Sequence, residues 1–252
     1  MDDTQLLRYS RHLLLDALGP DAQERFAASR ALVVGVGGLG NPAAQFLASA
    51  GVGRITLVDA DSVDLTNLQR QILFSMDDVG APKVEAAARR LAAINPEPVY
   101  VRIANRIGSA ELAALAAEAD VVLDCTDNFA TRHDINRACV DARVPLVSGA
   151  AVRFDGQVAV FDARDPASPC YHCLFGEGEE LEETRCATMG VFAPLVGIVG
   201  ATQAAEALKL IAGVGTSLAG RLLLLDALAM EWRSLRVPRD PVCPVCGTGT
   251  AP

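Results

Sequence analysis

The sequence predicts an α/β fold, with a doubly wound, mostly parallel sheet and an antiparallel extension. Short apolar runs alternate with alanine-rich helical stretches over residues 31–150, which is the pattern of parallel strands joined by helical crossovers. The glycine-rich segment Gly35 to Gly40 lies between the first strand-like run and the first helical stretch, as in Rossmann-like folds. After Ser148 strand-like runs follow one another directly, which favours antiparallel pairing.

Each element of the first half has a local reason. Strands are expected where short runs rich in Val, Ile and Leu occur: Ala31–Gly35, Arg54–Asp59, Val99–Ile103, Val121–Cys125 and Pro145–Ser148. Helices are expected where alanine-rich stretches stand between them, with proline or asparagine near several of their ends: Pro42–Ala50, Lys83–Ile94 and the stretches near 110–118 and 131–142.

The second half is expected to extend the same sheet. Asp155-Gly156 stands between AAVRF and QVAVF, and such a pair between apolar runs is typical of a two-residue hairpin turn. Further strands are expected at Arg221–Leu225 and around Trp232–Val237, above a long apolar helix at about Phe192–Ala212. That helix overlaps the uncharged run from Cys186 to Ala205, but its Pro, Gly, Thr and Gln residues favour a buried helix over a membrane span.

Composition and charge exclude several classes of protein. The chain has 252 residues, of which 51% are hydrophobic and 21% charged, so it can bury a large core and is not disordered. A net charge of -9 argues against general binding to nucleic acid or an anionic membrane. The polar N-terminal residues MDDTQLLRYSRH do not resemble a secretory signal, so we expect a cytoplasmic protein. The acidic stretch Gly176–Glu183 is expected to be a surface loop.

The glycine-rich segment is expected to bind a nucleotide. Its glycines permit a tight turn, so that N–H groups at the start of the following helix can face a phosphate. Asp59 ends the next strand, 19 residues beyond Gly40, where its carboxylate can accept the hydroxyl protons of a ribose. The same pattern occurs in NAD-dependent dehydrogenases, which therefore form an alternative class.

Charged residues farther along favour a triphosphate. The polar stretch from Asp61 to Gln71 carries Arg70, and Lys83 begins a helix, where a cation gains nothing from the helix dipole. The lysine stem could simply cover the surface, but a phosphate partner also explains its position. Asp127 and Asn128 follow another strand, whose carboxyl end is expected at the same edge of the sheet. Two cations and a carboxylate able to hold Mg²⁺ favour chemistry at the α-phosphate of ATP.

The seven cysteines of the chain favour a metal site over disulfides, because the count is odd and no secretory signal is evident. Two C-x-x-C pairs can place four thiolates around one tetrahedral Zn²⁺, with no open position for catalysis; they are Cys170, Cys173, Cys243 and Cys246. A redox pair is the alternative. His172, between the first two ligands, is expected to be a bystander. Cys125 and Cys139 are expected to lie in the core.

The joint set of motifs resembles the ThiF/MoeB family, the prokaryotic relatives of ubiquitin-activating enzymes. The motifs are GVGGLG, VDADSVDLTNLQRQ, APK, LDCTDN and the paired CxxC, and the resemblance extends from about Arg8 to Gly247. It implies ATP-dependent adenylation of the C-terminal Gly-Gly carboxylate of a ubiquitin-like sulfur-carrier protein, with release of pyrophosphate. The pathway, thiamine thiazole or molybdopterin biosynthesis, stays open: RYSRHLLL and RQILF are closer to ThiF, whereas SGAAVRFDGQVAVF is closer to MoeB.

The resemblance also implies roles for individual residues. ATP would be held by Gly38, Asp59, Thr66, Asn67, Leu68, Gln69 and Arg70, with Asn128 beside Asp127. Arg70 and Lys83 would neutralise the phosphates, and Asp127 would bind Mg²⁺. Arg11 would reach the neighbouring site across a homodimer interface. Cys186 would form a covalent link to the carrier in ThiF-like members and be dispensable in MoeB-like members, so its role stays open.

The organisation predicted is a single adenylation domain, 1–252. It comprises an N-terminal helical arm (1–30), a nucleotide-binding half (31–150) and a carrier-binding and zinc half (151–252). Because only six residues follow Cys246, sulfur is expected from a separate sulfurtransferase. Besides the dehydrogenase, a non-catalytic zinc-stabilised scaffold is an alternative, and it would bind ATP without pyrophosphate exchange.

Overall fold

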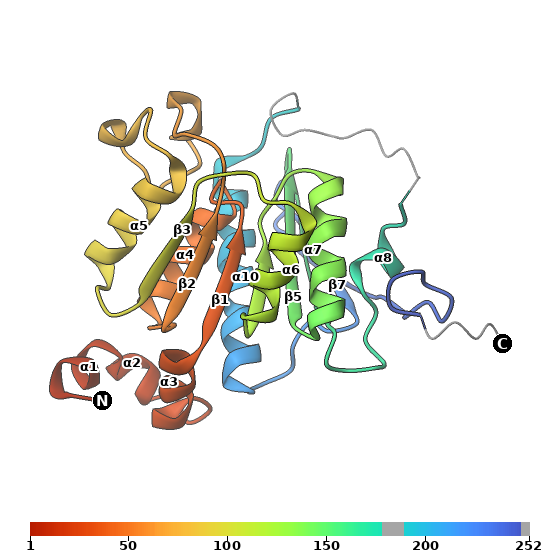
Figure 1. Cartoon of the computed structure of the whole chain (residues 1–252), viewed down its shortest axis with the longest axis horizontal. Coiled ribbons are helices and arrows are strands. Elements are labelled where there is room, and N and C mark those ends of the chain that lie inside the picture. The colour runs from red at the N-terminus through yellow and green to blue at the C-terminus, as the bar shows by residue number, and fades with distance from the viewer. Residues whose placement is uncertain (178–188, 248–252) are drawn as a thin grey trace.

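The computed structural model describes residues 1–177 and 189–247. The strands among them form one eight-stranded sheet in the order β3-β2-β1-β4-β5-β6-β7-β8 (Figure 1). Their bounds are β1 Arg30–Val34, β2 Arg54–Val58, β3 Val99–Ile103, β4 Val121–Asp124, β5 Pro145–Val152, β6 Asp155–Asp162, β7 Arg221–Asp226 and β8 Glu231–Arg236. β1 to β5 pair in parallel and β5 to β8 pair antiparallel. The predicted parallel sheet with an antiparallel extension is thus confirmed.

Helices cover both faces of this sheet. The helix bounds are α1 Asp3–Arg8, α2 Ser10–Leu13, α3 Gly19–Ala28, α4 Gly40–Ser49, α5 Lys83–Ile94, α6 Ser109–Ala117, α7 Phe129–Ala142, α8 Tyr171–Leu174 and α10 Ala193–Ala212. α4, α5 and α10 pack on one face, and α6 and α7 pack on the other (Figure 1). Along β1, Ala31 and Val33 face the first layer, whereas Leu32 and Val34 face the second. Burial on both faces explains why the central strands β1 and β4 are nearly continuous apolar runs.

The chain reverses its direction of winding between β1 and β4. It runs from β1 outward through β2 and β3, and then returns to β4 on the other side of β1. The connections that leave β1 and β4 therefore diverge, and a crevice opens at the carboxyl ends of these two strands. This topological switch point positions the candidate site.

The β5–β6 hairpin turns two residues earlier than Asp155-Gly156. Val152 pairs with Asp155, so Arg153-Phe154 is the turn and the predicted position was wrong. Arg153 has a φ of 51°, and its backbone N–H and C=O both pair with the segment that leads into α10. Gly156 serves helix packing instead, because a Cβ there would lie 2.8 Å from Leu195 Cδ1. A tertiary contact, not turn chemistry, explains this glycine.

α10 is the helix that the uncharged run predicted. It is the one helix among the described residues that is long and apolar enough to cross a membrane by length and composition. In the fold it is a core helix: Leu195, Val199 and Ala204 are fully buried, and the helix packs on α4 and beneath β4, β5 and β6. The buried Glu206 accepts the Leu218 N–H at 2.8 Å. The expectation of a buried helix is confirmed.

The N-terminal helices α1 to α3 lie at the amino ends of the strands, at the lower left of Figure 1. The Tyr9 hydroxyl donates to Glu97 Oε2 at 2.7 Å and accepts from Asn95 Nδ2 at 2.9 Å, which fastens this arm to the end of α5. At the other predicted boundary, β5 continues through residue 150 as far as Val152. The division into a nucleotide-binding and a carrier-binding half stays a prediction.

Candidate functional site

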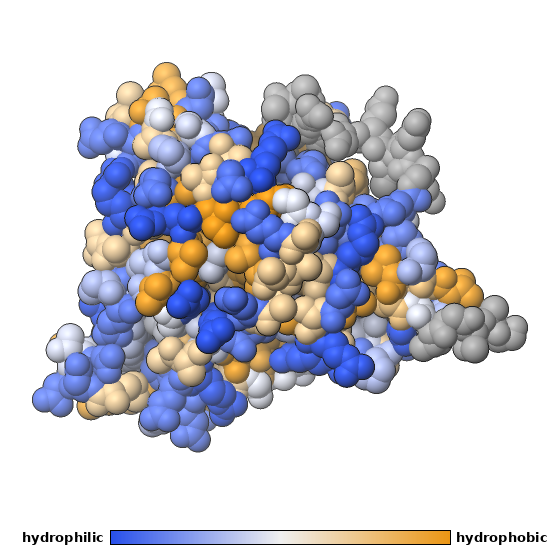
Figure 2. Space-filling view, viewed as in Figure 1, coloured by the Kyte–Doolittle hydropathy of each residue, from blue (hydrophilic) through white to orange (hydrophobic). Residues whose placement is uncertain are grey.

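A cavity of about 1080 Å³ opens at the carboxyl ends of β1, β2 and β4. It lies at the switch point, where open α/β sheets bind their ligands. Its wall mixes apolar and polar side chains, and Figure 2 shows apolar surface bordered by hydrophilic side chains near this end of the sheet. The predicted site residues that line it are Gly38, Asp59, Asn67, Arg70, Lys83, Asp127 and Asn128.

The glycine-rich loop brings the start of α4 to this cavity. Gly35 has a φ of 88°, and a Cβ there would lie 2.6 Å from the carbonyl oxygen of Cys125. A Cβ at Gly40 would lie 2.0 Å from the carbonyl oxygen of Gly35. Backbone therefore packs on backbone, and only glycine fits. Gly37 and Gly38 line the cavity at the beginning of α4, where the helix dipole and N–H groups favour an anion.

Asp59 ties this loop to the end of β2. Its Oδ2 accepts the Val36 N–H at 2.7 Å, and its Oδ1 accepts the Asp61 N–H at 2.9 Å. Burial raises the pKa of Asp59, although nearby Lys83 and the two N–H groups oppose this shift. The carboxylate lines the cavity beside the loop, where the sequence places a ribose ligand.

Two cations stand at the cavity wall. Lys83 is the first residue of α5, as predicted, and its Nζ lies 2.8 Å from Asp61 Oδ2. The lysine side chain is 8% exposed and the aspartate side chain 67%. The lysine side chain is therefore buried, and its ammonium group pairs with an exposed carboxylate. Arg70 donates from Nη1 to the Thr66 carbonyl at 3.1 Å. Both groups can neutralise an anion in the cavity.

The predicted run from Thr66 to Arg70 contributes unequally. Asp64 caps a 3₁₀ turn, Leu65–Asn67, and accepts the Thr66 hydroxyl at 2.6 Å. Asn67 and Arg70 line the cavity. Thr66, Leu68 and Gln69 are not among the described residues that line it. Their role in holding ATP stays a prediction.

Asp127 and Asn128 lie where β4 gives way to α7. Asp127 is exposed and lines the cavity, so its carboxylate is accessible to a cation there. Asn128 lines the cavity but also caps α7, because its Oδ1 accepts the Thr131 N–H at 2.9 Å. Its amide oxygen therefore has a structural task as well.

Sequence reasoning missed several residues of the cavity wall: Gln71, Asn105, Arg106 and Arg132. The buried Arg132 donates from Nη2 to the carbonyls of Thr126 at 2.7 Å and Gly149 at 3.3 Å, and so it supports the turn that carries Asp127. Arg132 lies four residues after Asn128, the cap residue of α7, and this spacing could have indicated that its side chain lies near the end of β4. Gln71 is 3% exposed, and its Oε1 is buried without a hydrogen-bond partner; it ends the polar run already recognised. Nothing in the local pattern marked Arg106.

Arg11 is not part of this cavity. It is an exposed residue of α2, at the opposite end of the sheet from the switch point (Figure 1). The family resemblance assigns Arg11 to the site of a neighbouring protomer, and this role stays a prediction.

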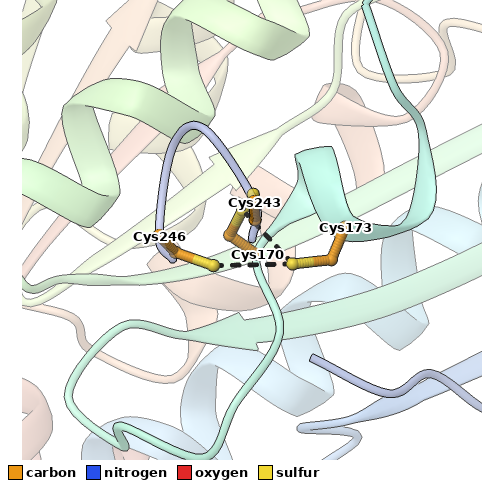
Figure 3. Close-up of side chains that lie close together, drawn as sticks. All are labelled: Cys170, Cys173, Cys243 and Cys246. Carbon is orange, nitrogen blue, oxygen red and sulfur yellow. Dashed lines mark hydrogen bonds between the residues drawn. The ribbon is translucent and has the colours of Figure 1, made fainter. Parts of the chain in front are cut away.

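The two C-x-x-C pairs form one four-sulfur cluster (Figure 3). The Sγ atoms of Cys170 and Cys173 are 3.9 Å apart, those of Cys170 and Cys243 are 3.7 Å apart, and those of Cys173 and Cys246 are 3.5 Å apart. Zn–S bonds of about 2.3 Å in a tetrahedron require S–S distances of about 3.8 Å. The four residues are free cysteines, and the Asp240 N–H points to Cys173 Sγ at 3.5 Å. The cluster fits zinc.

The other cysteines divide as follows. Cys125 and Cys139 are buried, and burial raises the pKa of both thiols, so they are core residues as expected. Cys186 and most of the acidic stretch lie outside the described residues.

The fold and the cavity define a nucleotide-binding α/β protein with a four-cysteine cluster. The family model of the ThiF family matches residues 9–245, and the chain belongs to this family. It is 48% identical over 250 residues to the molybdopterin-synthase adenylyltransferase of Escherichia coli (strain K12), covering 98% of each chain. It is 45% identical over 251 residues to the sulfur carrier protein ThiS adenylyltransferase of the same organism, covering 100% of this chain and 99% of that protein.

Among solved structures, the chain resembles a crystal structure of E. coli MccB with ATP. The TM-score is 0.83 at 29% sequence identity, and the match covers 95% of this chain and 73% of that chain. The fold of this chain is therefore similar to that of a protein crystallised with ATP.

Proposed function

We propose that this protein uses ATP to adenylate the C-terminal glycine carboxylate of a ubiquitin-like sulfur-carrier protein, with release of pyrophosphate. One observation carries the proposal: a single cavity at the switch point collects Gly38, Asp59, Arg70, Lys83 and Asp127. A dinucleotide-dependent dehydrogenase would need neither the two cations nor the exposed carboxylate. The names of the adenylyltransferase relatives support the same reaction.

The cavity groups would act on ATP by position and charge. The start of α4 would receive the phosphates, and Asp59 would hold the ribose. Arg70 and Lys83 would neutralise the negative charge that develops on the departing pyrophosphate. Asp127, a hard oxygen ligand at the same wall, would hold Mg²⁺, which supplies further neutralisation of phosphate charge.

The carrier would supply the nucleophile already activated. A C-terminal carboxylate is ionised at pH 7, so the reaction requires no general base. The carboxylate oxygen attacks the α-phosphorus, the bond to the bridging oxygen breaks, and pyrophosphate leaves. The rate enhancement can then come from in-line positioning and electrostatic stabilisation.

The antiparallel extension would receive the carrier tail. Ala150, Val152, Gln157 and Leu224 line the cavity on the side of β5, β6 and β7, away from the glycine-rich loop. A narrow Gly-Gly tail entering along these strands would meet the α-phosphate. Because the two full-length relatives are named for different pathways, a ThiS-like and a MoaD-like carrier are both candidates, and one enzyme could serve both.

We expect a separate sulfurtransferase to supply the sulfur for the activated carrier. Cys125 is the cysteine among the described cavity residues, and burial keeps its pKa high, so its thiol is a poor nucleophile. Cys186 stays a candidate for a covalent link to the carrier, to be tested by trapping with carrier and ATP. Reduced thiols in a zinc cluster suit a reducing compartment such as the cytoplasm.

The N-terminal arm supports a homodimer. Leu7, Leu14 and Leu15 are 78%, 72% and 51% exposed, and apolar side chains gathered on one arm are typical of an interface. The family resemblance implies that the Arg11 of a second protomer reaches the cavity, which requires the arm of one protomer to pack against the cavity end of the other. Zn²⁺ in the four-cysteine cluster would tie the C-terminal segment to α8.

Pyrophosphate exchange tests the proposal. With the cognate carrier, Arg70→Ala or Asp127→Ala should lower the ATP–pyrophosphate exchange rate by on the order of 10²-fold or more. Arg102→Ala is the matched control, because Arg102 pairs with Glu85 on the surface at 3.2 Å. Near-normal exchange in both site variants would contradict the assignment. ATP binding without exchange, with every candidate carrier, would favour a scaffold, and binding of a reduced nicotinamide cofactor would favour a dehydrogenase.

A further inference from the structure

Two imidazoles and a carboxylate converge beside the four-cysteine cluster. His133 comes from α7, His172 from α8, and Glu177 from the residues that follow α8. Each side chain offers one ligand atom, and these atoms all lie within 4.8 Å of one another. The fold brings the three residues together across the contact between α7 and α8.

The histidines lack protein partners at this point. The Nδ1 atoms of His133 and His172 are buried and have no hydrogen bond in the described structure. His133 is 4% exposed, and its Nδ1 lies 3.7 Å from Glu177 Oε1, beyond hydrogen-bond range. Burial lowers the pKa of His133, which favours the neutral imidazole that binds metals. An unpaired buried nitrogen is costly, unless a ligand from solution binds it.

Arg137 holds the carboxylate in place. Its Nη1 donates to Glu177 Oε1, and its Nη2 donates to Asp134 Oδ1 at 2.8 Å. The hydrogen bond from Arg137 keeps the pKa of Glu177 below its usual range. A carboxylate has about four lone-pair sites, so Glu177 can accept from Arg137 and still bind a cation. Carboxylates that bind metals are commonly hydrogen-bonded in this way.

We propose that His133, His172 and Glu177 form a second metal site for a first-row divalent transition ion such as Zn²⁺. Two imidazoles with one carboxylate are a known zinc donor set that leaves a coordination position for water. The site is chemically distinct from the four-cysteine cluster, although α8 contributes to both. A bound ion would fasten Glu177, at the start of the acidic stretch, to His133 of α7. His133 is the next residue after Arg132, which lines the cavity.

Metal titration of the purified full chain tests the proposal. After loading with Zn²⁺ and gel filtration, elemental analysis should find two equivalents in the wild type. His133→Gln and Glu177→Gln should retain one, with affinity for the second weakened by at least about 100-fold. His12→Gln is the matched control, since His12 is the remaining histidine of the chain and lies in α2; it should keep two.

Cobalt substitution separates the two sites. The first equivalent of Co²⁺ should show the charge-transfer absorption of thiolate ligands, and the second should add only ligand-field bands. The thiolate signal also reports that each variant is folded. If His133→Gln fails to fold, Glu177→Gln still tests the proposal, because it changes an exposed residue. One equivalent in the wild type at saturating metal would overturn the proposal. So would a second equivalent that both variants bind with unchanged affinity.

Discussion

The ion pair between Lys83 and Asp61 should compete with ATP. Lys83 Nζ lies 2.8 Å from Asp61 Oδ2, yet the proposed reaction needs this ammonium on a phosphate. Replacing Asp61 with asparagine removes the competing charge. The backbone N–H that Asp61 donates to Asp59 remains in the variant. We therefore expect Asp61→Asn to bind ATP more tightly than the wild type.

The gain can be bounded from the geometry. Two unit charges 2.8 Å apart attract by ~1.5 kcal/mol in water. Ordering and screening reduce exposed pairs to about 0.2–1 kcal/mol. Because Asp61 is mostly exposed whereas the lysine stem is buried, we take the upper half of this range. A difference of about 0.6–1 kcal/mol corresponds to roughly 3–5-fold tighter binding of ATP.

Calorimetric titration of ATP into both proteins measures this difference. The gain should shrink as ionic strength rises, because salt screens the pair. Glu85→Gln is the matched control: it removes one negative charge from α5, the helix that carries Lys83, and the carboxylate of Glu85 pairs with Arg102 on the surface. Weaker binding by Asp61→Asn would show that Asp61 positions Lys83 for the phosphate. An equal gain in Glu85→Gln would show an effect of net charge alone. Either result refutes the competition.

Three further predictions concern stability and metal content. Burial raises the pKa of Asp78, but hydrogen bonds from Ser75 and two arginines outweigh it and lower the pKa to about 2. Urea unfolding of Asp78→Asn at pH 7 should therefore show a loss of about 2–3 kcal/mol. Since the ionised carboxylate stabilises the fold above its unfolded pKa of about 3.9, the loss should vanish as pH falls to about 2; a pH-independent loss would contradict this. Gly149→Ala should cost about 1–3 kcal/mol in the same assay, because a Cβ would lie 2.4 Å from Cδ of the buried Gln203; unchanged stability would exclude that clash. Elemental analysis should find at least one equivalent of zinc fewer in Cys243→Ser than in Cys139→Ser, because Cys243 is a ligand of the four-cysteine cluster whereas Cys139 is a core residue; equal zinc in both variants would mean that other ligands hold the ion.

The sequence predicts the parallel half of the fold well because its central strands are buried on both faces, as Ala31–Val34 of β1 and Val121–Asp124 of β4 show. A strand buried on both faces reads as a nearly continuous apolar run. The edge strand β3 is only partly buried, yet its β-branched and aromatic residues also predict it, and Val99–Ile103 matches it residue for residue. Lys83–Ile94 matches α5 in the same way, since proline and asparagine stand at its two ends. The hairpin was misplaced because Gly156 was read as a turn residue. Its absent side chain instead makes room for Leu195, a contact that no local pattern records.

The residues of the candidate site also fall into two groups: some could be predicted from the sequence, and others depend on tertiary packing. Asp59 and Asp127 could be predicted, because each follows a strand, and parallel topology gathers the carboxyl ends of strands at one edge. Arg132 and Gln71 face the cavity only through the packing of a helix and a loop. The orientation of Arg132 depends on its hydrogen bonds to the carbonyl groups of Thr126 and Gly149, which are backbone groups of no particular residue type. The sequence therefore predicts a residue of this site where the sheet topology alone places its side chain at the cavity.

The two side-chain clusters that share α8 differ in the same way: one could be predicted from local spacing and the other could not. A C-x-x-C pair already places two thiolates at adjacent corners of a tetrahedron, so each half of the cysteine cluster is encoded locally and the second pair completes it. His133, His172 and Glu177 share no such spacing, and each has an ordinary surface or core explanation when considered alone. Their convergence requires α8 to pack against α7. Ligation of Cys170 and Cys173 would hold α8 in that position, and hence His172 against His133. Loss of the cysteine-bound ion should therefore weaken the histidine site, whereas loss of the histidine site should leave the cysteine cluster intact.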